Sequence, residues 1–214
     1  MKTYLAIPNC GWVEQEVVKT ITNASRNPLT FCTRPSSMLT DNFNELWCEF
    51  MNKDYTHFAM LHADISAENY WVDKLLTIME EKQADIVSVV MPIKDNTGDT
   101  STAFLPDGET KVRRLTLKEI RGLPETFCAS DVGLGTLLVN TGLWLAKKGE
   151  WCQKFKGFHA ISEVYMEEKW KARRISEDWL FSMEAKELGA KIYANRSISA
   201  THIGRQGWRN FIEA

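Results

Sequence analysis

Short apolar runs alternate with amphipathic stretches through residues 4–90. Each run lies between polar or turn-forming residues, which favours a strand over a helix. The predicted strands are Tyr4–Ile7, Leu29–Thr33, Phe58–Leu61 and Ile86–Val90. Between the runs, apolar residues recur every three or four positions, which predicts helices with one buried face. These faces contain Val13, Val17, Ile21 and Ala24; Phe43, Leu46, Trp47 and Phe50; and Trp71, Leu75, Ile78 and Met79.

This alternation of strand and helix predicts an α/β fold with a mostly parallel central sheet flanked by helices on both faces. In such sheets, ligands bind beyond the carboxyl ends of the strands. Pro8, Asn9, Arg34 and Asp64 fall just after predicted strands. We therefore expect these four residues to meet at one edge of the sheet.

The second half of the chain has a less regular pattern. Residues 94–110 are rich in Asp, Gly, Thr and Pro, which predicts a long loop or irregular hairpin, such as a lid. A strand is expected at 133–139, and a helix at 177–188 that begins after Ser176 and ends at Gly189. With no internal repeat or low-complexity segment, the 214 residues are predicted to form a single domain.

The composition is that of an ordinary globular protein. The net charge of −2 gives no overall attraction to nucleic acid or acidic lipid. The five cysteines are odd in number and lack C-x-x-C spacing, which argues against a zinc ribbon or a disulfide framework. No apolar run approaches the roughly 18 residues of a membrane helix. The first residues are typical of a strand rather than a signal peptide, so we expect a cytoplasmic protein with no membrane partner.

Asp64 closes the triplet His62-Ala63-Asp64 directly after a predicted strand. Together with imidazole nitrogens from His62 and the distant His202, its carboxylate is a donor set for a divalent cation. The mixture of oxygen and nitrogen favours Mn²⁺ over Mg²⁺. Such a cation stabilises a leaving diphosphate. The alternative is that Asp64 only caps a following helix and that His202 is a surface histidine.

Glu177 and Asp178 open the helix predicted after Ser176. The partial positive charge of a helix N-terminus is expected to keep such carboxylates ionised at neutral pH. Asp178 then serves as the group that takes a proton from an acceptor hydroxyl, and Glu177 as a residue that orients the acceptor. Simple capping of the helix is the alternative.

Polar residues after the first two strands form a candidate nucleotide pocket. Asn9 and the carbonyl group of Pro8 suit a base or ribose. Arg34, Ser36 and Ser37 suit phosphate or ribose oxygens. Asn42 is expected either to reach the base or to cap the second helix. The predicted donor-binding set is Pro8, Asn9, Arg34, Ser36, Ser37, Asn42, His62 and Ala63.

A basic run surrounds Trp170 just before the acidic pair. It contains Lys169, Lys171, Arg173 and Arg174. Cations interleaved with an aromatic side chain suit a phosphate backbone and a stacked base, which points to nucleic acid as a partner. A solvated helix face is the more ordinary alternative.

Taken in order, these segments make the chain similar to GT-A glycosyltransferases, close to the family 2-like group and to small enzymes of bacteriophage type. The resemblance is carried by Ala6–Asn9, Phe58–Ile65, Gly133–Val139, Ser176–Phe181 and Thr201–Gly204. It implies a GT-A (Rossmann-like) fold, with a nucleotide-binding half at 1–92 and an acceptor-binding half at 93–214. It also implies a nucleotide-sugar donor, with UDP as the usual carrier, and a bound divalent metal.

By this resemblance, Asp64 matches the last acid of a D-x-D motif and Asp178 the acid of an E-D motif. His202 resembles a C-terminal histidine that binds the metal. Gly135 and Trp179 fall in matching segments and are predicted to bind the acceptor. The chain departs from the pattern at His62, where the family usually has Asp. Whether His62 binds metal, contacts ribose or does neither is left open.

The leading hypothesis is a metal-dependent glycosyltransferase that moves a hexosyl or pentosyl group from a nucleotide diphosphate to a hydroxyl. A nucleotidyltransferase is one alternative, although the loop Pro8–Trp12 lacks the basic residues that such enzymes use there. A non-catalytic module that binds nucleotide sugars is another. The acceptor is open between a sugar, a lipid-linked glycan, a protein side chain and a modified DNA base of a phage. The oligomeric state is open too.

Overall fold

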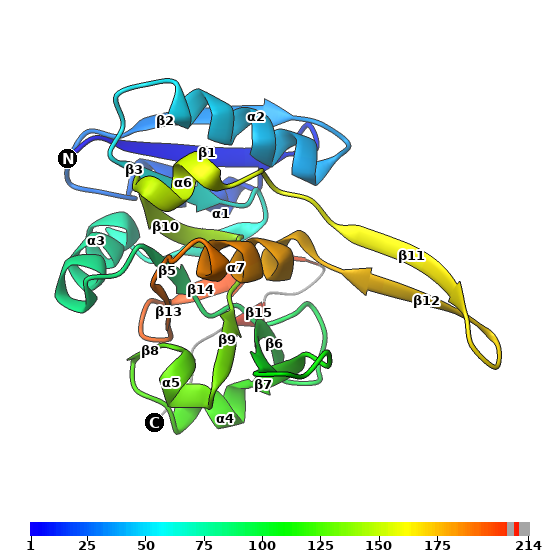
Figure 1. Cartoon of the computed structure of the whole chain (residues 1–214). Helices are drawn as coiled ribbons and strands as arrows, with labels where there is room; N and C mark the ends of the chain where they lie inside the picture. Colours follow the sequence, from blue (N-terminus) through cyan, green and yellow to red (C-terminus); the bar gives the residue numbers. More distant parts are fainter. Residues whose placement is uncertain (205–207, 210–214) are drawn as a thin grey trace.

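The computed structural model describes residues 1–204 and 208–209. Its centre is a seven-stranded sheet in the order β2-β1-β3-β10-β5-β13-β8 (Figure 1). The strands are β1 (Thr3–Asn9), β2 (Thr30–Pro35), β3 (His57–Leu61), β5 (Ile86–Val89), β8 (Thr126–Phe127), β10 (Leu143–Lys147) and β13 (Ile192–Asn195). Only β8 and β10 run against the shared direction of the other five. The predicted α/β fold with a mostly parallel sheet is confirmed.

Helices cover both faces of this sheet (Figure 1). They are α1 (Gln15–Thr22), α2 (Leu39–Met51), α3 (Trp71–Lys82), α6 (Glu150–Lys154) and α7 (Glu177–Glu187), with the short α4 (Leu117–Arg121) and α5 (Ala129–Val132) near β7 and β9. Side chains alternate across β3, so Phe58 and Met60 join the core under α2, α6 and α7. Ala59 and Leu61 join the core under α1 and α3.

β10 was not expected from the sequence pattern, and it links the two halves of the chain. It pairs antiparallel with both β3 and β5, in the middle of the sheet. Its residues Leu143–Ala146 are fully buried because helices cover both faces. Such a strand gives a continuous apolar run rather than an alternating pattern. Residues from the second half of the chain therefore complete the sheet begun by the first half.

Of the two alternatives expected at 94–110, the long loop is wrong and the irregular hairpin is confirmed. Residues Asp99–Pro106 form β6, which pairs antiparallel with β7 (Arg113–Thr116), with a shift in register, and with β9 (Gly135–Leu138) in a separate sheet. Threonine made this strand look like a loop by composition. Thr100 is nevertheless buried, because its hydroxyl group donates to the carbonyl oxygen of Leu115 at 2.7 Å.

Two smaller sheets complete the fold. β4 (Ile65–Ala67), β14 (Ala200–His202) and β15 (Trp208–Arg209) form one of them, beside the end of β3. β11 (Ile161–Met166) and β12 (Trp170–Ile175) form a two-stranded arm that projects from the body (Figure 1). In the described part of the chain, no helix is both long and apolar enough to cross a lipid bilayer.

Gly135 is required where β9 meets β6, opposite Pro106. Its φ is +141°, and an added Cβ would lie 2.1 Å from the carbonyl oxygen of Leu105. We expect Gly135→Ala to lower the free energy of unfolding by about 3 kcal/mol, measured by urea denaturation. The control is Gly189→Ala, which has a φ of +89° but no atom within 4 Å of the new Cβ. It should lose only about 1 kcal/mol. Equal losses would contradict a steric role for Gly135.

Candidate active site

A pocket of about 200 Å³ lies beyond the carboxyl ends of β1, β2 and β3. Because β1 pairs in parallel with both neighbours, the residues after these three strands meet at one edge. The pocket is lined by Pro8, Asn9, Cys10, Trp12, Ser36, Ser37, Leu39, His62, Ala63 and Asp64. Six of the eight predicted donor-binding residues are thus brought together with Asp64.

Asn42 supports this pocket but does not line it. Its side chain is 2% exposed and donates a hydrogen bond to the carbonyl oxygen of Asn9 at 2.9 Å. The same carbonyl oxygen accepts the backbone N–H of Ser36 at 3.0 Å. Asn42 therefore holds the loop after β1 against the loop after β2, which is a positioning role rather than the predicted contact with the base.

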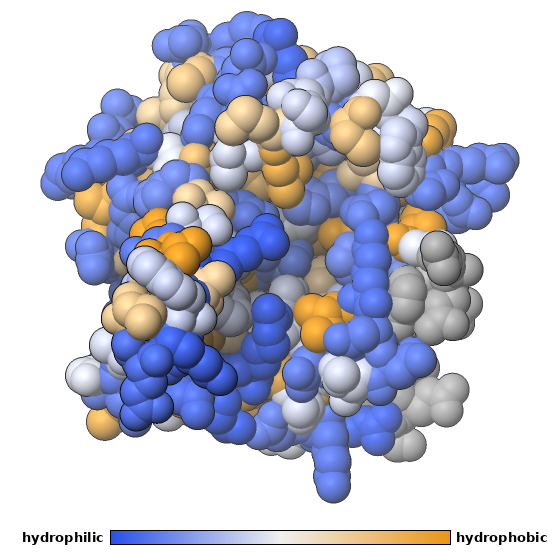
Figure 2. Space-filling view, turned by 90° about the vertical axis from the view of Figure 1, so that its right-hand side faces the viewer, coloured by the Kyte–Doolittle hydropathy of each residue, from blue (hydrophilic) through white to orange (hydrophobic). Residues whose placement is uncertain are grey.

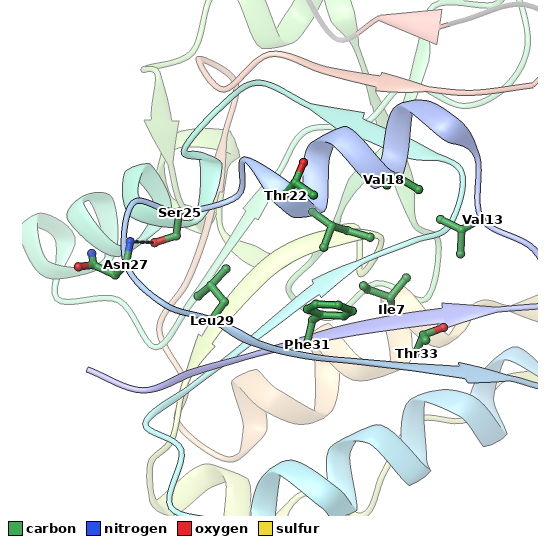
Figure 3. Close-up of a pocket in the computed structure, with 10 residues that line it drawn as sticks. Ile7, Val13, Val18, Thr22, Ser25, Asn27, Leu29, Phe31 and Thr33 are labelled. Carbon is green, nitrogen blue, oxygen red and sulfur yellow. Dashed lines mark hydrogen bonds between the residues drawn. The ribbon is translucent and has the colours of Figure 1, made fainter.

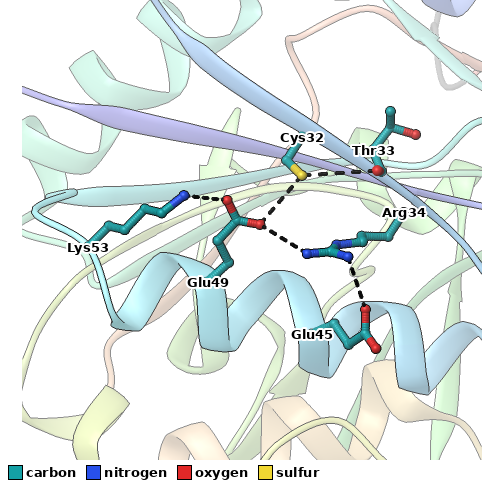
Figure 4. Close-up of polar contacts among 6 residues, drawn as sticks. All are labelled: Cys32, Thr33, Arg34, Glu45, Glu49 and Lys53. Carbon is teal, nitrogen blue, oxygen red and sulfur yellow. Dashed lines mark hydrogen bonds and ion pairs between the residues drawn. The ribbon is translucent and has the colours of Figure 1, made fainter.

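Arg34 also lies outside the pocket. Its guanidinium group turns toward α2, where it lies 3.7 Å from Glu45 and 3.6 Å from Glu49 (Figure 4). Glu49 is also bound by Lys53. The pKa of Glu49 is lowered, chiefly by that hydrogen bond from Lys53. The structure therefore gives Arg34 two carboxylate partners and does not place it beside the predicted phosphate-binding residues.

Asp64 and His202 face each other at the rim of the pocket. His202 Nε2 lies 3.6 Å from Asp64 Oδ2, because β14 pairs with β4 directly after Asp64. Lys94, in the loop after β5, donates a hydrogen bond to the same carboxylate oxygen. Burial opposes the ionisation of Asp64, but the hydrogen bonds from His202 and Lys94 outweigh it and hold its pKa well below the usual range.

The donor atoms of Asp64 and His202 fit a divalent metal as a pair. His202 Nδ1 lies 3.1 Å from the carbonyl oxygen of Pro92, which leaves Nε2 as the nitrogen available to a metal. His62 Nε2 is buried and has no hydrogen-bond partner among the described residues, so the role of His62 toward a metal stays a prediction. Burial also lowers the pKa of His62 to about 4. In residues 1–204, no three or more His, Cys, Asp or Glu side chains are grouped as a metal site.

Asp178 lies at the start of α7 and is bound by Thr141. Its Oδ1 accepts the backbone N–H of Thr141 at 2.9 Å and also the hydroxyl group of Thr141. Burial raises the pKa of Asp178 to about 6, with help from the neighbouring Glu177 carboxylate, against the effect of the Thr141 bonds. The expectation that the helix terminus would keep this pKa low is wrong, because removal from water has the larger effect.

One turn connects Asp178 to the pocket beside Asp64. Thr141 binds Asp178, and the next residue, Gly142, accepts the backbone N–H of His62 at 2.8 Å. A Cβ on Gly142 would lie 3.2 Å from His62 Nδ1, so glycine allows the turn to approach the imidazole closely. The candidate proton acceptor and the candidate donor pocket therefore lie on the same edge of the sheet.

The two predicted acceptor-binding residues both make contacts within the fold, and their contact with an acceptor stays a prediction. Gly135 lies against β6, and its carbonyl oxygen accepts a hydrogen bond from Lys186 at 2.7 Å. Trp179 donates from Nε1 to the carbonyl oxygen of Ser101 at 3.3 Å, and the guanidinium carbon of Arg114 lies 4.9 Å from the centre of its indole ring. Trp179 thus joins α7 to the sheet of β6, β7 and β9.

A larger cavity of about 440 Å³ lies between α1 and the edge strand β2 (Figure 3). Its walls are mainly apolar, with Ile7, Val18 and Phe31 among the lining side chains. Its lining, as far as the described residues go, contains no carboxylate, imidazole, thiol or basic group. Its size exceeds that of the pocket beside Asp64, but it offers no group for proton transfer or metal binding.

Two residues of the site, Thr141 and Lys94, were not singled out from the sequence. Thr141 belongs to the turn Asn140-Thr141-Gly142 before the apolar run Leu143–Ala146, a pattern that marks a strand start. Recognising that strand would have placed Thr141 at the sheet edge. Lys94 follows β5, so the rule for parallel strands would also have placed it at this edge.

Comparison with known proteins identifies the fold. No protein-family model and no curated protein matches the sequence. A197 from STIV is structurally similar, with a TM-score of 0.61 and 18% identity over 95% of this chain and 86% of that one. S. aureus TarS 1–349 in complex with UDP-GlcNAc is also similar, with a TM-score of 0.53 and 10% identity over 98% of this chain and 60% of that one. TarS 1–349 in complex with UDP gives a TM-score of 0.52 and 12% identity over 91% and 57%. These similarities confirm the expected GT-A fold.

The raised pKa of Asp178 makes a prediction about stability. The folded protein holds this proton up to about pH 6, whereas the carboxyl group ordinarily releases it near 3.8, so wild-type stability falls as pH rises between these values. Asp178→Asn has no charge to bury. We expect its melting temperature, relative to wild type, to be higher near pH 8 than near pH 4.5 in calorimetry.

The matched control for this measurement is Glu81→Gln, which removes a carboxylate from the exposed face of α3. Its melting temperature relative to wild type should be similar at both pH values. If Asp178→Asn also showed the same difference from wild type at both pH values, the raised pKa would be contradicted.

Proposed function

We propose that the protein transfers a sugar from a nucleotide-diphosphate donor to a hydroxyl acceptor, with a divalent metal at Asp64 and His202. The observation that carries this proposal is the 3.6 Å approach of His202 Nε2 to Asp64 Oδ2 at the rim of the pocket. A carboxylate oxygen and an imidazole nitrogen suit Mn²⁺. When bound, such a cation neutralises the charge that builds up on a leaving diphosphate.

The donor is proposed to be a UDP-sugar. Pro8, Asn9, Ser36 and Ser37 offer backbone and hydroxyl groups to the pocket, and Asp64 belongs to the same lining. These groups suit a base and ribose, with the diphosphate beside Asp64. The similar fold of TarS, solved with UDP and with UDP-GlcNAc, supports the choice of nucleotide.

Asp178 is proposed to take the proton from the acceptor hydroxyl. With a pKa of about 6, its carboxylate is ionised at neutral pH and still basic enough to bind a proton in the transition state. Thr141 donates both of its hydrogen bonds to Oδ1, which leaves Oδ2 as the oxygen for the acceptor. Glu177, the adjacent residue, is proposed to orient the acceptor.

The acceptor is proposed to be a hydroxyl group on a modified DNA base. The arm formed by β11 and β12 joins α7 at Ile175, three residues before Asp178, and Trp170 lies at its outer end, opposite Met166. Val164, Met166 and Trp170 share one face of the arm and are 70%, 57% and 71% exposed. Figure 2 views the molecule from the side to which the arm points and shows a hollow rimmed largely by hydrophilic residues.

The charges of the arm indicate how it would contact a nucleic acid. Arg173 lies 3.6 Å from Glu163, and Lys171 pairs with Glu167, so two of the four cations are neutralised within the arm. Lys169 and Arg174 make no ion pair within the described residues. Contact with a nucleic acid would therefore depend on stacking against Trp170 together with two cations, rather than on a large basic surface.

A matched pair of variants separates donor binding from transfer. We expect UDP with Mn²⁺ to raise the wild-type melting temperature, by an amount equivalent to about 2.7 kcal/mol at a concentration one hundred times Kd. Asp64→Asn should lose this shift because it removes the metal-binding charge. Asp178→Asn should keep the shift but lose at least about one hundredfold in release of UDP from a UDP-sugar.

The release of UDP is measured with a panel of nucleotide sugars as substrates, each with and without Mn²⁺. If no nucleotide sugar shifts the wild-type melting temperature, the proposed function is wrong. If Asp64→Asn keeps the full shift in melting temperature and wild-type turnover, the proposed metal site is wrong, but the proposed transfer reaction is not contradicted.

The acceptor proposal is tested by DNA binding. We expect Trp170→Ala to weaken binding of a fluorescent single-stranded oligonucleotide by about tenfold in anisotropy titrations, because one stacking contact is lost. The double variant with Lys169→Glu and Arg174→Glu should also flatten the salt dependence of binding. Lys82→Glu on α3, away from the arm (Figure 1), is the charge control. Equal affinities in all of these proteins would exclude the arm as a nucleic-acid contact.

A further inference from the structure

Lys94 adds a cation to the Asp64–His202 pair. Its ammonium group donates a hydrogen bond to Asp64 Oδ2, the oxygen that also faces His202 Nε2. All three side chains are partly sheltered: Lys94 is 35% exposed, Asp64 26% and His202 19%. A contact sheltered in this way is held more strongly than a pair of mobile surface charges. The ammonium group thus stands beside the oxygen that a metal would use.

The orientation of His202 brings its second nitrogen to the oxygen that Lys94 binds. A carbonyl oxygen only accepts hydrogen bonds, so the contact with Pro92 places a proton on His202 Nδ1. Nε2 then faces Asp64 Oδ2 at 3.6 Å, beside the ammonium group of Lys94. The segment from Pro92 to Lys94 both orients the imidazole and supplies the cation.

We propose that Lys94 is an exchangeable counter-cation of the metal and donor site. Its ammonium group neutralises Asp64 while the donor is absent. When a metal and a nucleoside diphosphate bind, Lys94 releases Asp64 and donates its hydrogen bonds to the diphosphate oxygens. This inference rests on the proposed function and adds a role for a residue that the function itself does not require.

The chemistry of lysine suits this exchange. Its charge is compact and sits on a flexible four-carbon chain, so the ammonium group can change partners without movement of the backbone. Phosphate oxygens accept charge-assisted hydrogen bonds as readily as a carboxylate does. Metal alone would leave the displaced ammonium group without an anionic partner, whereas a diphosphate provides one. Metal and nucleotide are therefore expected to strengthen each other's binding.

The test is Mn²⁺ binding with and without UDP, followed through the electron paramagnetic resonance signal of free Mn²⁺. In wild type, UDP should tighten Mn²⁺ binding, with a coupling on the order of 5–150-fold. Lys94→Met should bind Mn²⁺ alone about tenfold more tightly than wild type, and its coupling to UDP should fall severalfold. Lys94→Arg keeps the charge and should behave more like wild type.

Lys74→Met is the matched control, because Lys74 also pairs with a carboxylate, Glu68, at 2.7 Å but is not part of the site. It should leave both Mn²⁺ affinities unchanged, and the melting temperature of each variant reports whether it is folded. If wild type binds Mn²⁺ with UDP but Lys94→Met shows the same two affinities, the exchange is wrong and the proposed function stands. If wild type binds neither Mn²⁺ nor UDP, both are wrong.

Discussion

The arrangement of the site depends on the direction of one inserted strand. β10 runs antiparallel between β3 and β5, so its first residue, Leu143, lies opposite Leu61 at the carboxyl edge of the sheet. The turn before β10 is therefore held between the backbone of His62 and the carboxylate of Asp178. A parallel strand in the same place would have left that turn at the opposite edge. Hydrogen bonds of a single turn thus fix the pocket beside Asp64 and α7 relative to each other.

Two carboxylates at this edge are given opposite acidities by their partners. Asp64 is surrounded by cationic and imidazole donors, which outweigh the cost of burial and keep it charged. Among the described residues, Asp178 accepts hydrogen bonds from Thr141 alone and has a second carboxylate as a neighbour, so burial dominates. The first environment suits a permanent negative charge that binds cations. The second suits a group that gains and loses a proton near neutral pH.

The first half of the fold was accessible from the sequence because short apolar runs mark its strands and residues recurring every three or four positions mark its helices. The end of β3 was therefore placed correctly, with Asp64. Ser176 and the acidic pair after it marked the start of α7, with Asp178. β10 is an apolar run of the same kind, but it was missed because no helix separates it from β9, the strand before it. Arg34 and Asn42 were expected to contact the donor but do not line the pocket. The direction of a side chain after a strand depends on partners such as Glu49, which spacing alone does not show. The pKa of Asp178 likewise depends on burial by distant segments.

Arg34 also affects how the exposed edge strand β2 can pair with other molecules. β2 is an outermost strand, and most of its residues are exposed, including Phe31 at 59%. An open strand with an exposed aromatic side chain invites pairing with the same strand of another molecule. The ion pairs of Arg34 with α2 place charge along this border, and Pro35 removes a backbone donor at its end. Arg34 and Pro35 would therefore disfavour pairing between the β2 strands of different molecules, and with it the growth of larger assemblies.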